Sequence, residues 1–171
     1  MQILYIAQKM FSLFGKFDVK NQNGNLAYRV IGKPSLTKTL KIENAKGKPI
    51  GSIHKKMIAL LPTFEMFESG KKIGEIRKEV SLFRPKLSVS YEGWKVEGDF
   101  FNWNYIVKND KGQTIAKIDK ELWHMTDHYA IHYEDDQDSL VLLMIVLAID
   151  AIREEESAVT TNAANASSNN Q

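Results

Sequence analysis

An uninterrupted apolar run near the C-terminus restricts the possible folds more than any other feature of this sequence. Leu140 to Ile149 reads Leu-Val-Leu-Leu-Met-Ile-Val-Leu-Ala-Ile, with Asp138 and Ser139 as candidate helix caps before it. A membrane-spanning helix needs about 20 apolar residues, and shorter runs are more typical of buried core helices. A helix that is apolar on every side must be enclosed on every side. The run therefore predicts a buried helix near 138–153, with a tail anchor or a buried pair of strands as alternatives.

The region between Gln2 and Tyr133 has the pattern of short β-strands, because apolar and polar residues alternate between turn residues. Asn23-Gly24 indicates a tight hairpin, since a type I′ turn needs positive φ at both central residues. A dozen strands around an apolar helix predict a closed twelve-stranded antiparallel β-barrel with the helix threaded through it. The expected strands are roughly 2–7, 15–20, 25–31, 37–43, 49–56, 63–68, 72–79, 86–91, 94–98, 103–108, 113–120 and 127–133.

One segment occurs three times in this region: Gly47–Lys55, Gly70–Lys78 and Gly112–Lys120 align without gaps. Each copy has a turn glycine, an isoleucine, a very small residue, a second isoleucine and a lysine. Three ordinary hairpins of similar outline are the alternative to a true repeat. Alternation along a strand places the small residue and the second isoleucine on one face, which we expect to point inward and to be approached closely by something bulky. The residues of this face are Gly51, Ile53, Gly74, Ile76, Ala116 and Ile118.

Composition excludes some classes of site and partner. The absence of cysteine rules out disulfides, thiolate metal sites and a cysteine nucleophile, and it fits a reducing cytosol. Lysine and arginine total 23 against 21 acidic residues, so the net charge of +2 offers no bulk electrostatic case for nucleic acid. The N-terminal apolar patch is too short for a signal-peptide core, because Gln2, Gln8 and Lys9 bracket it.

The C-terminal segment 157–171 consists mainly of Ser, Thr, Asn and Ala. Such a segment has almost no apolar surface with which to offset the entropy of ordering. The sequence therefore predicts a folded domain at 1–156 and a disordered polar tail at 157–171.

Several segments in their order and spacing resemble the LURP-one-related family. They are Gln8-Lys9 and Asn23-Gly24, Gly98-Asp99 before Trp103-Asn-Tyr-Ile, and Asp127-His-Tyr-Ala-Ile-His-Tyr133 before the apolar run that ends Ala-Ile-Asp150. The resemblance covers roughly residues 2–153. It implies the tubby C-terminal-like fold, a twelve-stranded barrel around a central hydrophobic helix, and a distant relation to phospholipid scramblases. It supplies no function, and no phosphoinositide-binding residue of the tubby proteins is matched here.

Histidines and acids do not form a recognisable catalytic or metal centre. His124, His128 and His132 recur every four residues, but the intervening alternation indicates a strand, on which the last two lie about 13 Å apart. We expect Tyr129, Ile131 and Tyr133 to face the helix and the two histidines to face water. The acids Glu134, Asp135, Asp136 and Asp138 are interpreted as helix-capping and solubilising groups, and Asp150 as a structural carboxylate near a barrel mouth. No nucleophile elbow or phosphate loop occurs, so neither enzymatic activity nor a cofactor is expected.

Basic residues at strand ends provide the leading functional hypothesis. If they gather at one end of the barrel, they form a cationic patch, and each contributes about 1 kcal/mol near an anionic bilayer; solvated strand edges are the alternative. The candidate anion-binding residues are Lys55, Lys56, Lys71, Lys72, Arg77, Lys78, Arg84 and Lys86. The structural helix residues are Leu140, Leu143, Met144, Val146, Leu147, Ile149 and Asp150.

These observations lead us to expect a cytoplasmic, non-catalytic binding or scaffolding module without a transmembrane span. Its partner would be an anionic lipid headgroup or a protein, which allows a peripheral location at the membrane. A carrier that holds a small apolar ligand inside the barrel is the alternative. A metal-dependent enzyme using His128 or Asp136 is a third hypothesis.

Overall fold

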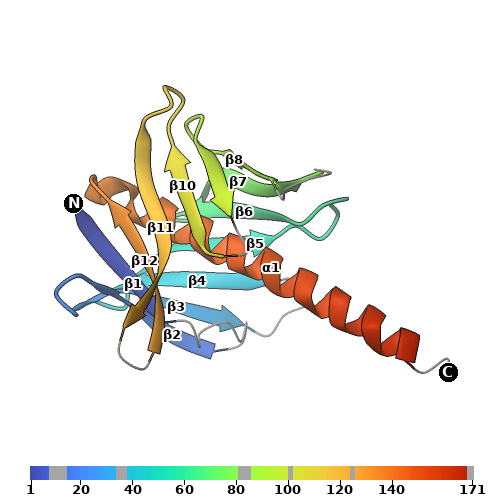
Figure 1. Ribbon diagram of the computed structural model, residues 1–171. Coiled ribbons are helices and arrows are strands. Elements are labelled where there is room, and N and C mark those ends of the chain that lie inside the picture. The colour runs from blue at the N-terminus through green and yellow to red at the C-terminus, as the bar shows by residue number, and fades with distance from the viewer. Residues whose placement is uncertain (8–14, 34–37, 81–85, 100–101, 124–125, 169–171) are drawn as a thin grey trace.

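Every strand expected from alternation is present, with bounds that differ by three residues at most. The computed structural model describes residues 1–7, 15–33, 38–80, 86–99, 102–123 and 126–168. The strands are β1 (Gln2–Ala7), β2 (Gly15–Asn21), β3 (Leu26–Lys33), β4 (Thr39–Asn44), β5 (Pro49–Lys55), β6 (Thr63–Glu68), β7 (Lys71–Glu79), β8 (Lys86–Ser90), β9 (Lys95–Asp99), β10 (Asn104–Lys108), β11 (Thr114–Trp123) and β12 (Thr126–Tyr133). Each pairs antiparallel with its sequence neighbour, and β1 pairs with β12, so the sheet closes into a barrel (Figure 1).

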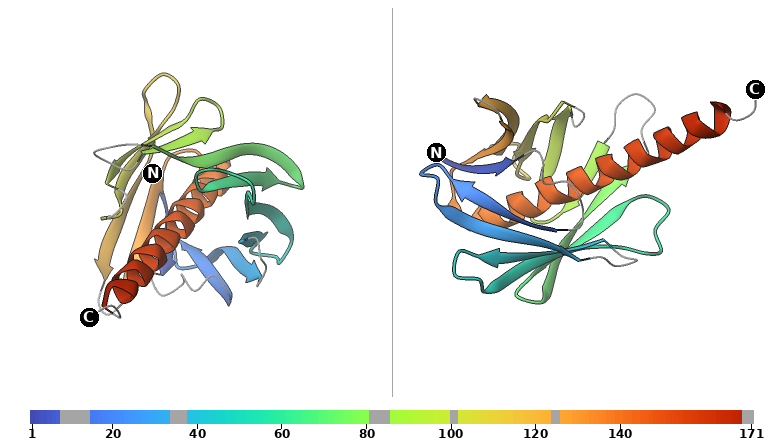
Figure 2. Two further views of the ribbon diagram at one scale, coloured as in Figure 1. Left: turned by 90° about the vertical axis from the view of Figure 1, so that its right-hand side faces the viewer. Right: turned by 90° about the horizontal axis from the view of Figure 1, so that it is seen from below.

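A single long helix passes through the barrel. A short 3₁₀ turn, η2 (Asp136–Asp138), leads into α1 (Ser139–Ser168), which emerges at the far end of the barrel (Figure 2). All helix residues from Leu140 to Ile152 are buried. The apolar run is therefore a core helix, and the alternatives of a tail anchor and a strand pair are wrong. Among the described residues, no helix is both long and apolar enough to cross a membrane.

The helix extends further than the sequence suggested. Residues 157–168 continue α1, whereas we expected the polar tail to be disordered from 157 onward. Adding residues to an existing helix is much less costly than starting one, and alanines at 163, 164 and 166 favour helix. Residues 153–156 are half-buried and Ser157 is exposed.

The inward face predicted for the repeat is largely confirmed. Ile53, Ile76 and Ile118 are completely buried. A Cβ atom at Gly51 would collide with Met144 Cε and come within 3.3 Å of Leu140 Cδ1, so the bulky neighbour there is α1. At Gly74 the obstacle is instead the carbonyl oxygen of Ser90, on the neighbouring strand β8.

The hairpin at Asn23-Gly24 is present, but its expected turn type is wrong. Only Gly24 has positive φ, at 77°, and its N–H donates to Asn21 O at 2.9 Å. The Asn21 side chain also accepts hydrogen bonds from Asn23 N and Asn25 N, both at 3.0 Å. The turn is therefore centred on residues 22–23, and the glycine occupies the position after it.

Candidate functional site

The predicted basic residues separate into groups at different places on the barrel. Lys55 and Lys78 lie at the end from which α1 emerges, because their strands β5 and β7 both end there. We call this the exit end. Lys71 lies at the opposite end, in register with Glu68 beside the β6–β7 turn. Arg84 lies outside the described residues, and Lys86 is described only by its backbone, which pairs with Glu79.

Two of the predicted lysines belong to an ion-pair network on the outer surface. Lys72 Nζ lies 2.7 Å from Glu65 and 2.5 Å from Glu75, and Lys56 Nζ lies 3.5 Å from the same Glu75 oxygen. The hydrogen bond from Lys72 lowers the pKa of Glu75 despite partial desolvation. Arg77 lies exposed on β7, and no ion pair to another described residue is found for it. The basic residues therefore do not form one continuous uncompensated patch among the described side chains.

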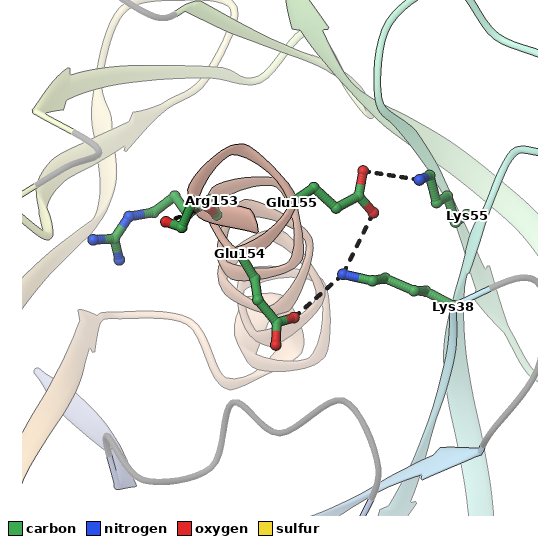
Figure 3. A network of polar contacts seen from close by, with 6 residues as sticks. Lys38, Lys55, Arg153, Glu154 and Glu155 are labelled. Carbon is green, nitrogen blue, oxygen red and sulfur yellow. Dashed lines mark hydrogen bonds and ion pairs between the residues drawn. The ribbon is translucent and has the colours of Figure 1, made fainter. Parts of the chain in front are cut away.

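At the exit end, acids of α1 contact lysines of the barrel. Glu154 Oε2 lies 3.2 Å from Lys38 Nζ. Glu155 bridges two lysines, at 3.4 Å from Lys38 and 2.8 Å from Lys55 (Figure 3). The two lysines come from separate segments, which are joined by a 2.9 Å hydrogen bond from Lys55 N to Lys38 O.

A third pair completes this arrangement, since Glu156 contacts Lys78 at the end of β7. A 3.0 Å hydrogen bond from Lys78 N to Pro62 O fixes this strand end against the β5–β6 loop. We call the six residues the exit clasp: Lys38, Lys55 and Lys78 with Glu154, Glu155 and Glu156. Sequence analysis identified two of its lysines and did not single out Lys38, because no local pattern indicates which strand-end lysine faces a helix.

Asp150 lies one helical turn before the clasp and is only 7% exposed. Burial raises its pKa from 3.8 to about 8, an effect that Arg153 and Lys38 oppose and Glu154 reinforces. At neutral pH this carboxyl is therefore mainly protonated, and it can act as a hydrogen-bond donor. Asp150 is thus a buried neutral acid, a state that its sequence position alone does not reveal.

Aromatic side chains form the opposite wall of this end. The Arg153 guanidinium lies 4.5 Å from the centroid of the Trp103 ring, which stacks on Tyr129 at 3.8 Å. Tyr105 lies beside them, and burial raises its pKa well above 10. Trp103 has φ of 51°, a conformation that costs a non-glycine residue about 1–3 kcal/mol. The strained backbone holds the indole where it can meet Arg153, although the structure assigns no substrate to this cluster.

An exposed apolar loop borders the exit end. Met57, Ile58 and Leu60, in the loop between β5 and β6, are among the most exposed large apolar side chains, with Ile58 at 93% and Leu60 at 105%. Val80, directly after β7, is also exposed. Figure 1 shows the connection between β5 and β6 on the side of the barrel where α1 emerges. Sequence analysis did not single out these aliphatic residues.

The histidine region carries a surface pocket. His132 Nε2 lies 3.3 Å from Asp119 Oδ1, and Lys117 pairs with the other oxygen of Asp119 at 2.6 Å. They border an open pocket of about 420 Å³ that is lined by β11, the end of β12, Glu134 and Met1. Tyr129, Ile131 and Tyr133 are buried, as expected. His124 lies outside the described residues and the side chain of His128 is not described; within the described chain, no three His, Asp or Glu side chains could hold a metal ion.

The chain thus has the architecture of a twelve-stranded β-barrel threaded by an apolar C-terminal helix. The family model described as LURP-one-related matches residues 2–150, and the chain belongs to this family. This confirms the resemblance drawn from the sequence.

Two known proteins are similar to the chain over most of its length. The "Uncharacterized protein YxjI" of Bacillus subtilis (strain 168) is 28% identical over 158 residues, which cover 91% of this chain and 98% of that protein. The X-ray structure of the Arabidopsis thaliana protein AT5G01750 matches with a TM-score of 0.61 and 14% identity, covering 88% of this chain and 90% of the other. The second likeness shows the shared fold alone. These matches indicate no catalytic family.

Proposed function

We propose that this protein is a non-catalytic module that binds anionic membrane surfaces through its exit end. The observation that carries the proposal is the exposed apolar loop at Met57–Leu60, which directly follows Lys55 and Lys56. Apolar side chains next to basic ones are the combination that peripheral membrane segments use, because the former enter the bilayer boundary and the latter attract anionic headgroups.

The apolar part of this surface is large enough to matter. Full burial of a leucine, isoleucine or methionine side chain contributes about 1.5–3 kcal/mol. Three such side chains lie in one loop, and Val80 adds a fourth on the neighbouring connection. Transfer of these side chains from water into an apolar environment lowers the free energy of the system.

The basic part determines which membranes would bind. Lys55 and Lys56 lie directly before the loop, and Arg77 and Lys78 lie near the end of β7, on the other side of β6. Arg77 is exposed, whereas Lys55, Lys56 and Lys78 form the ion pairs described above and are available to a membrane only when these pairs open. Each cation contributes about 1 kcal/mol near an anionic surface, and this contribution decreases as salt increases. The proposal therefore requires binding that depends on both anionic lipid and ionic strength.

The filled interior of the barrel favours membrane binding at the exit end over the alternative function, the carriage of an apolar ligand inside the barrel. Side chains of α1 from Leu140 to Ile152 occupy the interior in which an apolar ligand would have to lie. The 420 Å³ pocket near His132 is open to solvent, and Lys117, Asp119 and Glu134 are among its lining residues.

Co-sedimentation with vesicles tests the proposal. We expect the protein to sediment with phosphatidylcholine vesicles that contain phosphatidylserine, and not with phosphatidylcholine alone. The variant Met57→Ser/Ile58→Ser/Leu60→Ser should bind at least about tenfold more weakly, because each lost apolar contact is worth more than 1 kcal/mol. Its unfolding midpoint serves as the folding control, since exposed substitutions change stability by only about 0.5 kcal/mol. Binding that is indifferent to the anionic lipid or to the triple substitution would refute the proposal.

A further inference from the structure

Three barrel lysines surround one turn of α1 at the exit end. Lys38 precedes β4, Lys55 ends β5 and Lys78 lies near the end of β7, so segments distant in sequence bring them together. Consecutive helix residues point about 100° apart, yet each of the three acids at 154–156 meets a lysine. Figure 3 shows two of these lysines, Lys38 and Lys55, reaching toward the helix from the barrel wall. Two of the lysines, Lys38 and Lys55, converge on the same carboxylate of Glu155, which is the arrangement expected of an anion site.

The carboxylates that occupy this arrangement are held weakly. The side chains are 21–36% exposed. Ion pairs with this access to solvent contribute about 0–1 kcal/mol each. A phosphate monoester carries a charge of about −1.5 to −2 and three acceptor oxygens, so one such group can satisfy several lysines at once.

The turn that carries Glu154–Glu156 can also move away from the barrel lysines without disturbing the packed core. Ile152 ends the continuously buried stretch of α1 that begins at Ser139, and residues 153–156 are half-buried. Beyond Ile152, the contacts of α1 with the barrel include the clasp itself and the stacking of Arg153 on Trp103. Displacement of the clasp would therefore expose the lysines and leave the packed segment 140–152 in place.

We propose that Lys38, Lys55 and Lys78 form a binding site for phosphate-bearing groups, and that Glu154–Glu156 act as a built-in competitor for it. The inference rests on the proposed membrane function for its ligand class and adds its regulation. In the absence of a membrane the acids neutralise the lysines. At a membrane, phosphate groups replace the acids while the neighbouring apolar loop enters the bilayer.

Neutralising the competitor gives the principal test. The variant Glu154→Gln/Glu155→Gln/Glu156→Gln should bind phosphatidylcholine vesicles containing a phosphatidylinositol phosphate about tenfold more tightly than the unaltered chain, since three carboxylates no longer compete. Removal of negative charge alone could increase binding to an anionic surface. The matched control Glu43→Gln/Glu68→Gln/Asp110→Asn makes the same charge change near turns at the other end of the barrel, and it should change binding by less than about threefold.

The second arm removes the site. Lys38→Met/Lys55→Met/Lys78→Met should abolish the gain when added to the glutamine variant, with folding verified by thermal unfolding. Inorganic phosphate, titrated into the glutamine variant by calorimetry, shows whether a free anion suffices: saturable binding that competes with vesicles assigns the site to free phosphate as well, and vesicle binding without phosphate binding assigns it to headgroups.

The outcomes separate this inference from the proposed function. If neither the unaltered chain nor any variant binds anionic vesicles, the proposed function fails and the inference fails with it. If the unaltered chain binds through its apolar loop, but the glutamine variant matches the charge control, the proposed function stands and the built-in competitor is disproved.

Discussion

The two ends of the barrel hold the same helix by different kinds of interaction. At the end where α1 begins, Tyr28 Oη and Ser139 Oγ lie 2.6 Å apart, and Ser139 Oγ also donates to Asp136 O at 2.6 Å. At the exit end the contacts are ion pairs beside the buried acid Asp150. Neutral hydrogen bonds depend little on ionic strength, whereas partly exposed ion pairs weaken as salt is added.

The packing of α1 against the barrel also differs between the two ends. Near its start the helix touches the sheet so closely that Gly51 leaves no room for a Cβ atom beside Met144. Near the exit it carries half-buried charged residues. The difference suggests that the first end anchors the helix and that the second responds to solution conditions. The following predictions are ordered by the size of the expected effect.

The largest effect is expected where the helix meets Gly51. Met144→Ala should lower the free energy of unfolding by about 2–5 kcal/mol, the usual cost of deleting a buried methionine side chain. It should also make room for Gly51→Ala, so that the second substitution costs much less in the Met144→Ala background than alone. Urea unfolding of the four proteins measures both effects.

Gly74→Ala provides the matched control for that cycle. Its obstacle is the Ser90 carbonyl, a backbone atom that Met144→Ala cannot move. The cost of Gly74→Ala should therefore be the same in both backgrounds. Equal rescue of Gly51→Ala and Gly74→Ala would contradict the assignment of α1 as the close neighbour of Gly51.

The sequence was sufficient to predict this anchored part. The run from Leu140 to Ile149 predicts a helix that must be enclosed, and the small residue before Ile53 predicts a close approach. Both features are local patterns whose meaning depends only on periodicity and size. The turn at Asn23-Gly24 was predicted in place but not in type, because Asn21 supplies the side-chain acceptor that selects the observed turn.

The exit end could be predicted only in part. The basic residues at 55 and 78 were identified, but their partners at 155 and 156 are 100 and 78 positions away, and only the closed barrel brings them together. The fully exposed side chains of Ile58 and Leu60 could not be inferred from apolarity alone, since apolar residues are more often buried. The protonated state of Asp150 likewise depends on burial by distant strands.

The next effect concerns pH and Asp150. An aspartate in the unfolded chain has its ordinary pKa near 4, whereas the folded pKa is about 8. Between these values the unfolded state releases the proton and the folded state keeps it, so this group makes stability fall as pH rises from about 4 to 8. Asp150→Asn keeps the shape of the neutral acid and removes this dependence.

The variant should equal the unaltered protein in stability near pH 4 and exceed it by on the order of 2–4 kcal/mol near pH 8. Urea unfolding across this range provides the measurement. Asp110→Asn, in an exposed turn, serves as the control for the loss of one carboxylate. A difference between Asp150→Asn and the unaltered protein that does not change with pH would show that the carboxyl is ionised throughout.

The smallest expected effects are coupling energies, which two double-mutant cycles measure, one at each end of the barrel. At the exit end, Lys78→Met and Glu156→Gln should show a coupling energy of about 0.2–1 kcal/mol, typical of a partly exposed ion pair. At the other end, Tyr28→Phe and Ser139→Ala should show about 0.5–1.5 kcal/mol for a neutral hydrogen bond. In 1 M salt the screening length shortens to about 3 Å. The Lys78–Glu156 coupling should then largely disappear while the Tyr28–Ser139 coupling remains, and equal loss of both would mean that the two ends respond to solution conditions in the same way.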